Sequence, residues 1–302
     1  MYHTPILLKE VIEGLEVGLK ADGVFVDCTF GGGSHSRQIL SLLHPGGKLI
    51  GFDQDEDARQ NLPEDNRFIF VPNNFRHLQR FLRLHKIIKV DGVLADLGVS
   101  SHQFDKAERG FSIRLEGDLD MRMDKRQVLS AYDVVTTYSE ERLHKLFEQY
   151  GEVTNARTLA LTIVSLRRTV SFKTVNDFKT ALSALVKGNP NKYFAQVFQA
   201  LRIEVNDELG ALREMLQQVP QVLKPGGRVA IISFHSLEDR IVKNFFRKRN
   251  LDEGPENPFL QETDRDPVFK IITRKPIVPG TEELAVNSRA RSAKLRIAEL
   301  IK

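Results

Sequence analysis

Four short apolar runs alternate with helical patterns over the first hundred residues, and this alternation constrains the fold more than any other feature. The runs are VFVD (24–27), KLIGFD (48–53), FIFV (68–71) and GVLADL (92–97). Each is rich in β-branched or aromatic residues and is bounded by Gly, Pro, Asn or Asp, which is typical of a strand. Strands that alternate with helices indicate an α/β fold built on a parallel sheet.

The pattern changes to helices over residues 106–193. Leu143, Leu146 and Phe147 recur at helical spacing behind Ser139, which we predict to be an N-cap. A further helix is predicted to contain Leu159, Ile163 and Leu166, and another to begin at Thr174 with Asp177 in a capping-box arrangement and to end before Gly188 and Pro190. We therefore predict an all-helical insertion domain, 106–193, inside an α/β domain formed by 1–105 and 194–302.

The α/β pattern resumes after the insertion. A long amphipathic stretch from Phe194 to Leu216 leads through KPGG into the apolar run RVAIISF (228–234). Two closing strands are predicted at VFKIITRK (268–275) and SAKLRIAEL (292–300).

Composition indicates a soluble globular protein, since 41% of the 302 residues are hydrophobic and 28% are charged. The start, MYHTPILLKEVIEGLEV, lacks the pattern of a signal peptide, and no run of about 18 apolar residues occurs, so we expect a cytoplasmic protein without a membrane segment. The single cysteine, Cys28, excludes an intramolecular disulfide and a Cys-based zinc cluster, and we expect chemistry without a metal.

The balance of charge is basic. The net charge is +4 and the pI is near 9.1, and basic residues crowd the last third of the chain. This favours a polyanionic partner, although a solvated surface explains the charge about as well.

The first predicted strand ends in Asp27 and is followed by Gly31, Gly32 and Gly33, where the chain turns into a helix. In doubly wound folds this turn binds nucleotide-like ligands, because glycines allow close approach and a helix N-terminus favours an anion. No G-K-[ST] follows, which excludes a P-loop, and Ser36 replaces the third glycine of the dinucleotide motif. The spacing suits S-adenosylmethionine better, although a glycine-rich turn without a ligand remains an alternative.

Two acidic residues end further strands. Asp53 lies about 20 residues beyond the glycines, where a carboxylate can accept hydrogen bonds from two ribose hydroxyls, although it could instead be an N-cap, a role that suits Asp55 equally well. Asp96 ends the fourth strand, where cofactor and substrate should meet, and could orient an exocyclic amine toward a sulfonium methyl group. A capping role or contact with the cofactor amine is the alternative for Asp96.

Three of the eight histidines, His35, His102 and His235, follow predicted strand ends, and the others are expected to be ordinary surface or partly packed residues. None is paired at the spacing of metal ligands.

The segments DCTFGGGSHS, GFDQD, ADLGVSSHQFD, DLDMRMD, LKPGGRVAIISFHSLEDRIVK and SRARSAKLRIAE resemble the bacterial 16S ribosomal RNA cytosine-N4 methyltransferase family, almost from end to end. The resemblance implies a Rossmann-like class I methyltransferase sheet interrupted by a helical domain for substrate recognition. It also implies transfer of a methyl group from S-adenosylmethionine to the exocyclic N4 amine of a cytidine in the decoding region of 16S ribosomal RNA. We expect the assembled small subunit, rather than protein-free RNA, to be the substrate.

Carried over by the resemblance, the cofactor contacts are Gly33, Ser34, His35, Asp53, Phe75, Asp96 and Gln103, with Asp96 also catalytic. Ser34 stands where the family usually has glycine, so a positive φ there would be strained, and Ser288 stands where proline is common. Phe75 suits one face of the adenine, with a buried core position as the alternative. Candidates for RNA binding are Arg240, Lys243, Arg289 and Arg291. Candidates for stacking on the target base are Phe104, Phe111 and Phe234.

Three other functions remain open on the sequence alone. One is methyl transfer to a small molecule or a protein. Another is a non-catalytic RNA-binding or assembly factor that retains a nucleoside pocket. The third, a nicotinamide-dependent oxidoreductase, is disfavoured by the glycine pattern.

Overall fold

The computed structural model describes residues 5–248 and 268–302. Backbone contacts divide the chain into two compact units, Met1–Gly98 with Leu209–Lys302, and Val99–Glu208, which we call the sheet unit and the helical unit. Both boundaries differ from the expected ones at 105/106 and 193/194. Among the described helices, none combines the length and apolar character needed to cross a membrane.

The difference at the second boundary comes from α9 (Pro190–Asn206), which is one uninterrupted helix. The Asn189 side chain caps it by accepting hydrogen bonds from the backbone N–H groups of Asn191 and Lys192, and Pro190 occupies the first turn. The apolar face of α9 packs into the core of the helical unit, so residues 190–206 belong there. The helix ends at Asp207, which is left-handed (φ 46°), so the amphipathic stretch forms two helices.

The difference at the first boundary has a similar cause. Helix α4 (Ser101–Asp105) is capped by Ser100, and Val99 and Phe104 on either side of the cap pack against the core of the helical unit. The chain therefore enters the helical unit directly after Gly98.

Seven strands of the described residues form one sheet in the order β3-β2-β1-β4-β5-β7-β6. The strands are β1 (Val24–Asp27), β2 (Lys48–Phe52), β3 (Phe68–Val71), β4 (Val90–Asp96), β5 (Leu223–Ser233), β6 (Phe269–Ile271) and β7 (Lys294–Leu300). The first five are parallel, and β7 runs antiparallel between β5 and β6. The order reverses between β1 and β4, which places a ligand crevice at the carboxyl ends of these strands. This confirms the predicted α/β, Rossmann-like class. The strand predicted at 268–275 is shorter in the structure, where β6 contains only Phe269–Ile271.

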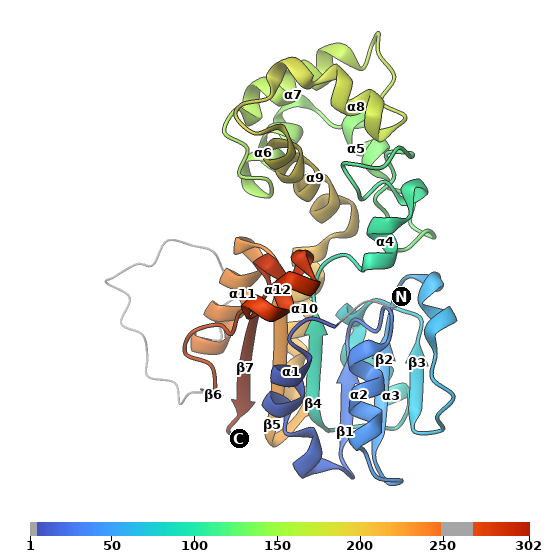
Figure 1. Ribbon diagram of the computed structural model, residues 1–302, viewed down its shortest axis with the longest axis vertical. Coiled ribbons are helices and arrows are strands. Elements are labelled where there is room, and N and C mark those ends of the chain that lie inside the picture. Colours follow the sequence, from blue (N-terminus) through green and yellow to red (C-terminus); the bar gives the residue numbers. More distant parts are fainter. Residues whose placement is uncertain (1–4, 249–267) are drawn as a thin grey trace. The chain divides into compact units, whose positions relative to one another are not determined.

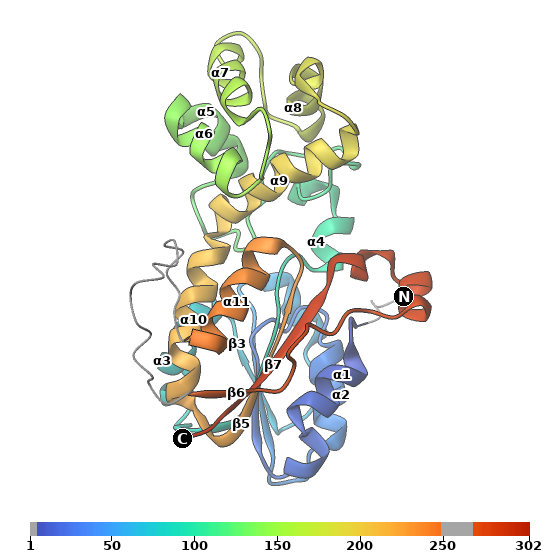
Figure 2. The ribbon, with the colours of Figure 1, turned by 90° about the vertical axis from the view of Figure 1, so that its left-hand side faces the viewer.

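Helices cover both faces of the sheet, as the edge-on view shows (Figure 2). Helices α1 (Leu8–Leu15) and α2 (Ser34–Leu42) lie on one side, and α3 (Leu78–Leu84), α10 (Glu208–Val222) and α11 (Ser236–Lys248) lie on the other (Figures 1 and 2). Strand side chains alternate between the two faces. The core between the sheet and helices α1 and α2 contains Val11, Leu15 and Ile39 of the helices and Phe25, Leu94 and Ile232 of the strands.

The helical unit has its own apolar core. Besides α4 and α9 it contains α5 (Ala131–Thr137), α6 (Glu140–Gln149), α7 (Ala156–Leu166) and α8 (Val175–Ala181). The predicted N-caps Ser139 and Thr174 are confirmed, and Thr174 and Asp177 form the expected capping box.

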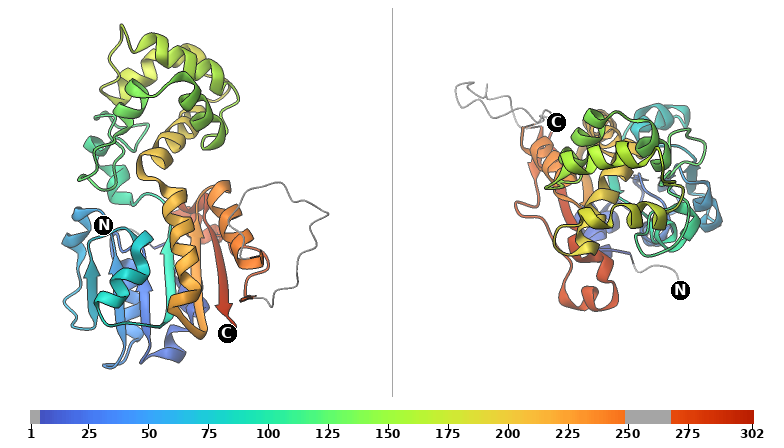
Figure 3. Two further views of the ribbon diagram at one scale, coloured as in Figure 1. Left: turned by 180° about the vertical axis from the view of Figure 1, so that it is seen from behind. Right: turned by 90° about the horizontal axis from the view of Figure 1, so that it is seen from above.

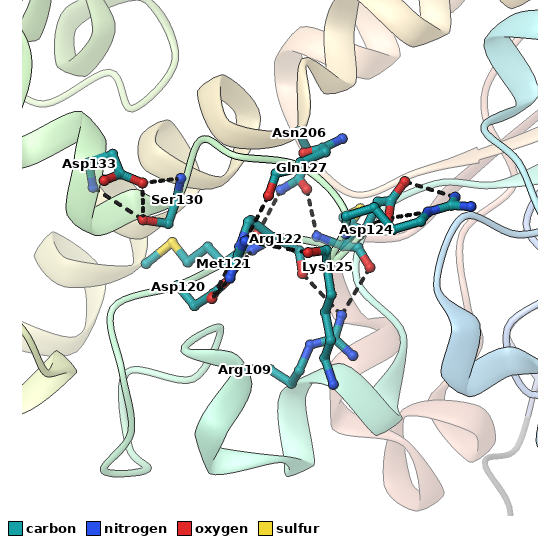
Figure 4. Close-up of polar contacts among 12 residues, drawn as sticks. Arg109, Asp120, Met121, Arg122, Asp124, Lys125, Gln127, Ser130, Asp133 and Asn206 are labelled. Atoms are coloured by element: carbon teal, nitrogen blue, oxygen red, sulfur yellow. Dashed lines mark hydrogen bonds and ion pairs between the residues drawn. The ribbon is translucent and has the colours of Figure 1, made fainter.

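Two buried polar side chains hold the loop before α5 in place (Figure 4). The Arg109 guanidinium is 2% exposed and donates to the backbone carbonyls of Arg122 and Met123, both at 3.0 Å. The Asn206 amide, also buried, accepts from the N–H of Met123 at 2.7 Å and donates to the carbonyl of Met121 at 2.8 Å. These bonds stabilise a loop in which Met121 is left-handed (φ 61°).

We expect Asn206→Ala to lower the free energy of unfolding of the helical unit by about 2–4 kcal/mol, because it leaves a buried N–H and a buried carbonyl of this loop without partners. Urea denaturation and hydrogen exchange at the amides of Ala131 and Tyr132, which donate to carbonyls of the same loop, measure the effect. Asn191→Ala, on the exposed side of the same helix, is the matched control and should change little. Equal effects of the two variants would contradict the assignment.

Candidate functional site at the carboxyl edge of the sheet

The glycine turn after β1 has the geometry of a ligand-binding loop. Gly33 is the N-cap residue of α2 and is left-handed (φ 72°), and Gly31 also has a positive φ (49°). Ser34 is the first residue of α2, and it is absent from the described residues with positive φ. The expected strain at Ser34 is therefore wrong, since the left-handed position falls on Gly33, where glycine carries no steric penalty.

Hydrogen bonds from the ends of the two neighbouring strands, β2 and β4, hold the turn, and its outer side is open. The N–H of Gly31 donates to Asp53 Oδ2 at 2.7 Å, and the N–H of Asp96 donates to Thr29 Oγ1 at 2.7 Å. A methyl group built on Gly32 would meet no atom within 4 Å. The turn is thus rigid, and a ligand has space to approach its backbone.

Asp53 follows β2 and faces this turn. Its Oδ1 accepts from the N–H of Asp55 at 2.8 Å while Oδ2 accepts from Gly31, so the carboxylate bridges the two loops. Nothing in the local sequence pattern around Asp53 predicts this bridge. The capping role falls to Asp55, whose side chain accepts from the N–H of Asp57. Each Asp53 oxygen accepts one of these bonds and has a second lone pair, which is the arrangement needed to accept from two vicinal hydroxyls.

Asp96 ends β4 and faces His35 in the first turn of α2. The distance between His35 Nδ1 and Asp96 Oδ2 is 3.9 Å, and His35 Nε2 lies 3.0 Å from the carbonyl of Ile6. Because a carbonyl only accepts, Nε2 carries a hydrogen, and Nδ1 is the ring nitrogen that faces Asp96. The other carboxyl oxygen, Oδ1, is buried and accepts no hydrogen bond from the described residues.

Acidic groups gather along this edge of the sheet. Burial raises the pKa of Asp53 and that of Asp96 to about 7. Backbone hydrogen bonds lower the pKa of Asp53, and the neighbouring His35 lowers the pKa of Asp96, but both effects are weaker than that of burial. Burial also raises the pKa of Asp27, which accepts from the Ser36 hydroxyl at 2.7 Å. The charges of Asp27 and Glu238 raise the pKa of Asp96 further. Buried carboxyl groups with raised pKa values form a site that favours a cation.

The turn after β5 brings an aromatic ring to the same edge. The N–H of Phe234 donates to Glu238 Oε2 at 2.8 Å, and the buried Glu238 also lies 3.2 Å from His235 Nε2 through Oε1. Asp96 pairs in register with Ile232, two residues before Phe234. A methyl group built on Gly98, which has φ 97°, would lie 3.4 Å from Cδ2 of the Phe234 ring. The half-exposed ring therefore lies against the chain just beyond Asp96.

Most of the predicted site residues lie together on the sheet unit. Phe75 begins the 3₁₀ helix η3 (Phe75–His77) after β3 and is half-exposed, so it is not the buried core residue that the sequence left as an alternative. Gln103 belongs to the helical unit, and its carbonyl oxygen accepts from the N–H of Ser100 in the capping box of α4. Phe111 is wrong as a stacking candidate, because it is 4% exposed in the core of the helical unit. Phe104 packs against the same core.

The basic candidates lie on two elements of the sheet unit. Arg240 is exposed and Lys243 is half-buried on α11, and Arg289 and Arg291 are exposed on the 3₁₀ helix η6 (Ser288–Ser292). Their availability to a polyanion remains a prediction. Arg296, by contrast, is buried and pairs with Asp239 at 2.6 Å, so it stabilises the contact between β7 and α11.

Together these groups can bind a ligand that carries a vicinal diol near Asp53, a planar ring near Phe75 and a positive charge near Asp27 and Asp96. Asp96 ends β4 at the same edge, close in the chain to Gly98, against which the Phe234 ring lies. The arrangement suits transfer of a group from a cationic nucleoside to an acceptor that reaches the same edge.

We expect Asp96→Asn to raise the melting temperature at pH 8 by about 2–6 °C. In the folded chain the Asp96 pKa is about 7, well above its ordinary value of 3.8, so its ionisation costs folding free energy as pH rises from about 4 to 7, and the full cost remains above pH 7. Asparagine stays neutral at both pH values and so avoids this cost. The gain should therefore shrink at pH 5, as thermal melts at the two pH values will show.

Asp65→Asn is a control for which we expect the opposite change in melting temperature. Hydrogen bonds from Arg67 lower the pKa of Asp65 to about 2, so its ionised form stabilises the fold above pH 4 and that contribution is lost as pH falls through 2. This variant should lower the melting temperature at pH 8. A decrease at pH 8 for Asp96→Asn as well would contradict the buried-carboxyl interpretation.

Comparison with known proteins identifies close relatives over nearly the whole chain. A family model described as the MraW methylase family matches residues 1–301. The chain is 52% identical over 299 residues to the ribosomal RNA small subunit methyltransferase H of Bacteroides thetaiotaomicron. The aligned region covers 99% of this chain and 97% of that relative. It is 52% identical over 298 residues to the protein of the same name from Christiangramia forsetii, covering 98% and 97% of the two chains.

Proposed function

The chain belongs to the MraW methylase family, and on that premise we propose that it transfers a methyl group from S-adenosylmethionine to the N4 amine of a cytidine in the decoding region of 16S ribosomal RNA. The observation that carries the proposal is the match to ribosomal RNA small subunit methyltransferases along almost the full length of both chains. The specific nucleotide and the N4 position rest on the motifs shared with the family. The assembled small subunit is the proposed substrate.

The carboxyl edge of the sheet fits this cofactor. Asp53 would accept from the ribose hydroxyls, Phe75 would contact the adenine, and the backbone at Gly33, Ser34 and His35 would hold the methionine part, with Gln103 as a further predicted contact. The buried carboxyl groups of Asp27 and Asp96 favour the positive charge of the ligand. When bound, S-adenosylmethionine supplies an electrophilic methyl group on a sulfonium.

Asp96 is the proposed catalytic residue. Its carboxyl group, which is partly exposed as a whole, would accept a hydrogen bond from the cytidine amine and so direct the nitrogen lone pair toward the methyl group. Methylation would leave the amine with one proton to lose. A carboxylate whose pKa is about 7 in the ligand-free protein can accept that proton.

Phe234 is the proposed stacking partner of the target base. It is the half-exposed aromatic ring beside Asp96 on the sheet unit, and the turn that presents it is held by the buried Glu238. Enzymes that modify a base take it out of its stack and hold it against aromatic side chains. The helical unit would recognise RNA around the target.

Radiolabelled S-adenosylmethionine and small ribosomal subunits from cells that lack this enzyme test the function. We expect label in N4-methylcytidine after nucleoside analysis, and about 10²–10⁴-fold slower transfer by Asp96→Ala, because the amine loses its acceptor. Cofactor binding by both proteins is measured in parallel. Absence of label in RNA with intact cofactor binding would contradict the ribosomal assignment, and equal or faster transfer to protein-free RNA would contradict the assembled subunit as substrate.

A pair of phenylalanine variants separates the two binding sites. Phe234→Leu should raise the KM for subunits or lower kcat by about 5–150-fold, since base stacking is worth about 1–3 kcal/mol, and should leave the cofactor Kd unchanged. Phe234→Tyr, which keeps a ring, should retain activity. Phe75→Leu should instead weaken cofactor binding, as calorimetry will show. A Phe234→Leu enzyme with wild-type kinetics would eliminate Phe234 as the stacking residue.

A further inference from the structure

Helices α3 and α10 cover the face of the sheet unit that is seen from behind (Figure 3, left). Residues of η3, α3 and α10 line a basic groove. Its volume is about 430 Å³, and its lining includes Arg76, Gln79, Arg80, Arg83 and Gln218. Glu214, the acidic neighbour of Arg76, is not among the lining residues. None of the residues proposed for the cofactor or the base belongs to it.

Side-chain hydrogen bonds fix the shape of the groove. Arg76 donates through Nε and Nη2 to the two carboxyl oxygens of Glu214, at 3.1 and 2.8 Å. Gln218 accepts from the N–H of Gln79 at 2.9 Å and donates to the carbonyl of Arg76 at 2.6 Å. These contacts tie the start of α3 to α10, so the groove exists before any partner binds.

Two arginines supply its uncompensated charge. Leu78 and Leu82 of α3 are buried, which turns Arg80 and Arg83 outward, three residues apart on the exposed side of the helix. Neither guanidinium forms an ion pair or hydrogen bond with another described residue, and Arg80 lies 6.0 Å from the centre of the Phe81 ring. Arginine forks match phosphate oxygens, and free guanidinium groups beside amide side chains suit a backbone of repeated phosphates.

The position of the groove connects it to the catalytic edge. Its lining starts at Arg76, directly after Phe75 at the carboxyl end of β3, and continues along α3 to Arg83. At about 1.5 Å per helical residue this path is about 10 Å long, which matches about three nucleotides at 3.4 Å rise in a duplex strand. An RNA strand that presents a base at Asp96 would pass the ends of β1 and β2 at the same edge before it enters the groove.

We propose that this groove binds the sugar–phosphate backbone of the substrate RNA beyond the target nucleotide, with Arg80 and Arg83 as its phosphate contacts. The proposal rests on the proposed function, because it requires an RNA acceptor. The groove positions the substrate and takes no part in the transfer itself.

The test compares Arg80→Glu/Arg83→Glu with the wild-type protein in binding to small subunits and to protein-free 16S RNA at several salt concentrations. Loss of two phosphate contacts should reduce the slope of log affinity against log salt by about 1.4–1.8 and weaken binding at least 10-fold at low salt. The cofactor Kd and kcat at saturating subunits should stay within twofold of wild type. Arg80→Gln/Arg83→Gln, which removes charge without reversing it, should show a smaller change in the same direction.

The control is Lys9→Glu/Lys48→Glu, which makes the same change in net charge at two exposed positions away from the groove. Wild-type affinity and salt slope in the groove variant, or equal losses in the control, would overturn the proposal. Loss of binding to subunits with unchanged binding to protein-free RNA would also overturn it, because the groove would then contact a protein. Failure of the wild-type protein itself to label or bind RNA would instead count against the proposed function.

Discussion

Burial of carboxyl groups at the ends of neighbouring parallel strands is the constraint on which the site depends. The carboxyl ends of parallel strands meet at one edge, so Asp27, Asp53 and Asp96 at the ends of β1, β2 and β4 are brought together. Burial raises the pKa of each of these residues. This arrangement costs stability in the ligand-free chain. It also prepares the edge for a cation, because a positive charge removes both the repulsion and part of the desolvation cost.

Hydrogen bonds from backbone N–H groups to side-chain oxygens give the edge its rigidity. Asp53 holds the glycine turn through Gly31, Thr29 accepts from the N–H of Asp96, and Glu238 accepts from the N–H of Phe234. Each of these bonds crosses from one strand end to another segment or closes a tight turn. Groups held by the scaffold in this way are already placed before a ligand arrives, which is what catalysis by orientation requires.

The helical unit is stabilised independently by a core of its own and by two buried polar anchors. Arg109 and Asn206 satisfy backbone groups of the loop that contains the left-handed Met121. Buried donors and acceptors fully paired in this way specify one loop conformation. The segment DLDMRMD is thus held by residues far away in the sequence, a relation that its own pattern does not reveal.

The sequence by itself determined the local structure and the family. The strand positions and the N-caps at Ser139, Thr174 and Asp55 depend on short-range periodicity and turn chemistry, and they were predicted closely. Only the tertiary structure decided that α9 belongs to the helical unit, that β7 is antiparallel, that His35 faces Asp96, and that Arg80 and Arg83 line a groove. These features depend on which distant segments pack together, and packing between segments far apart in the sequence leaves no mark in the local pattern of either one.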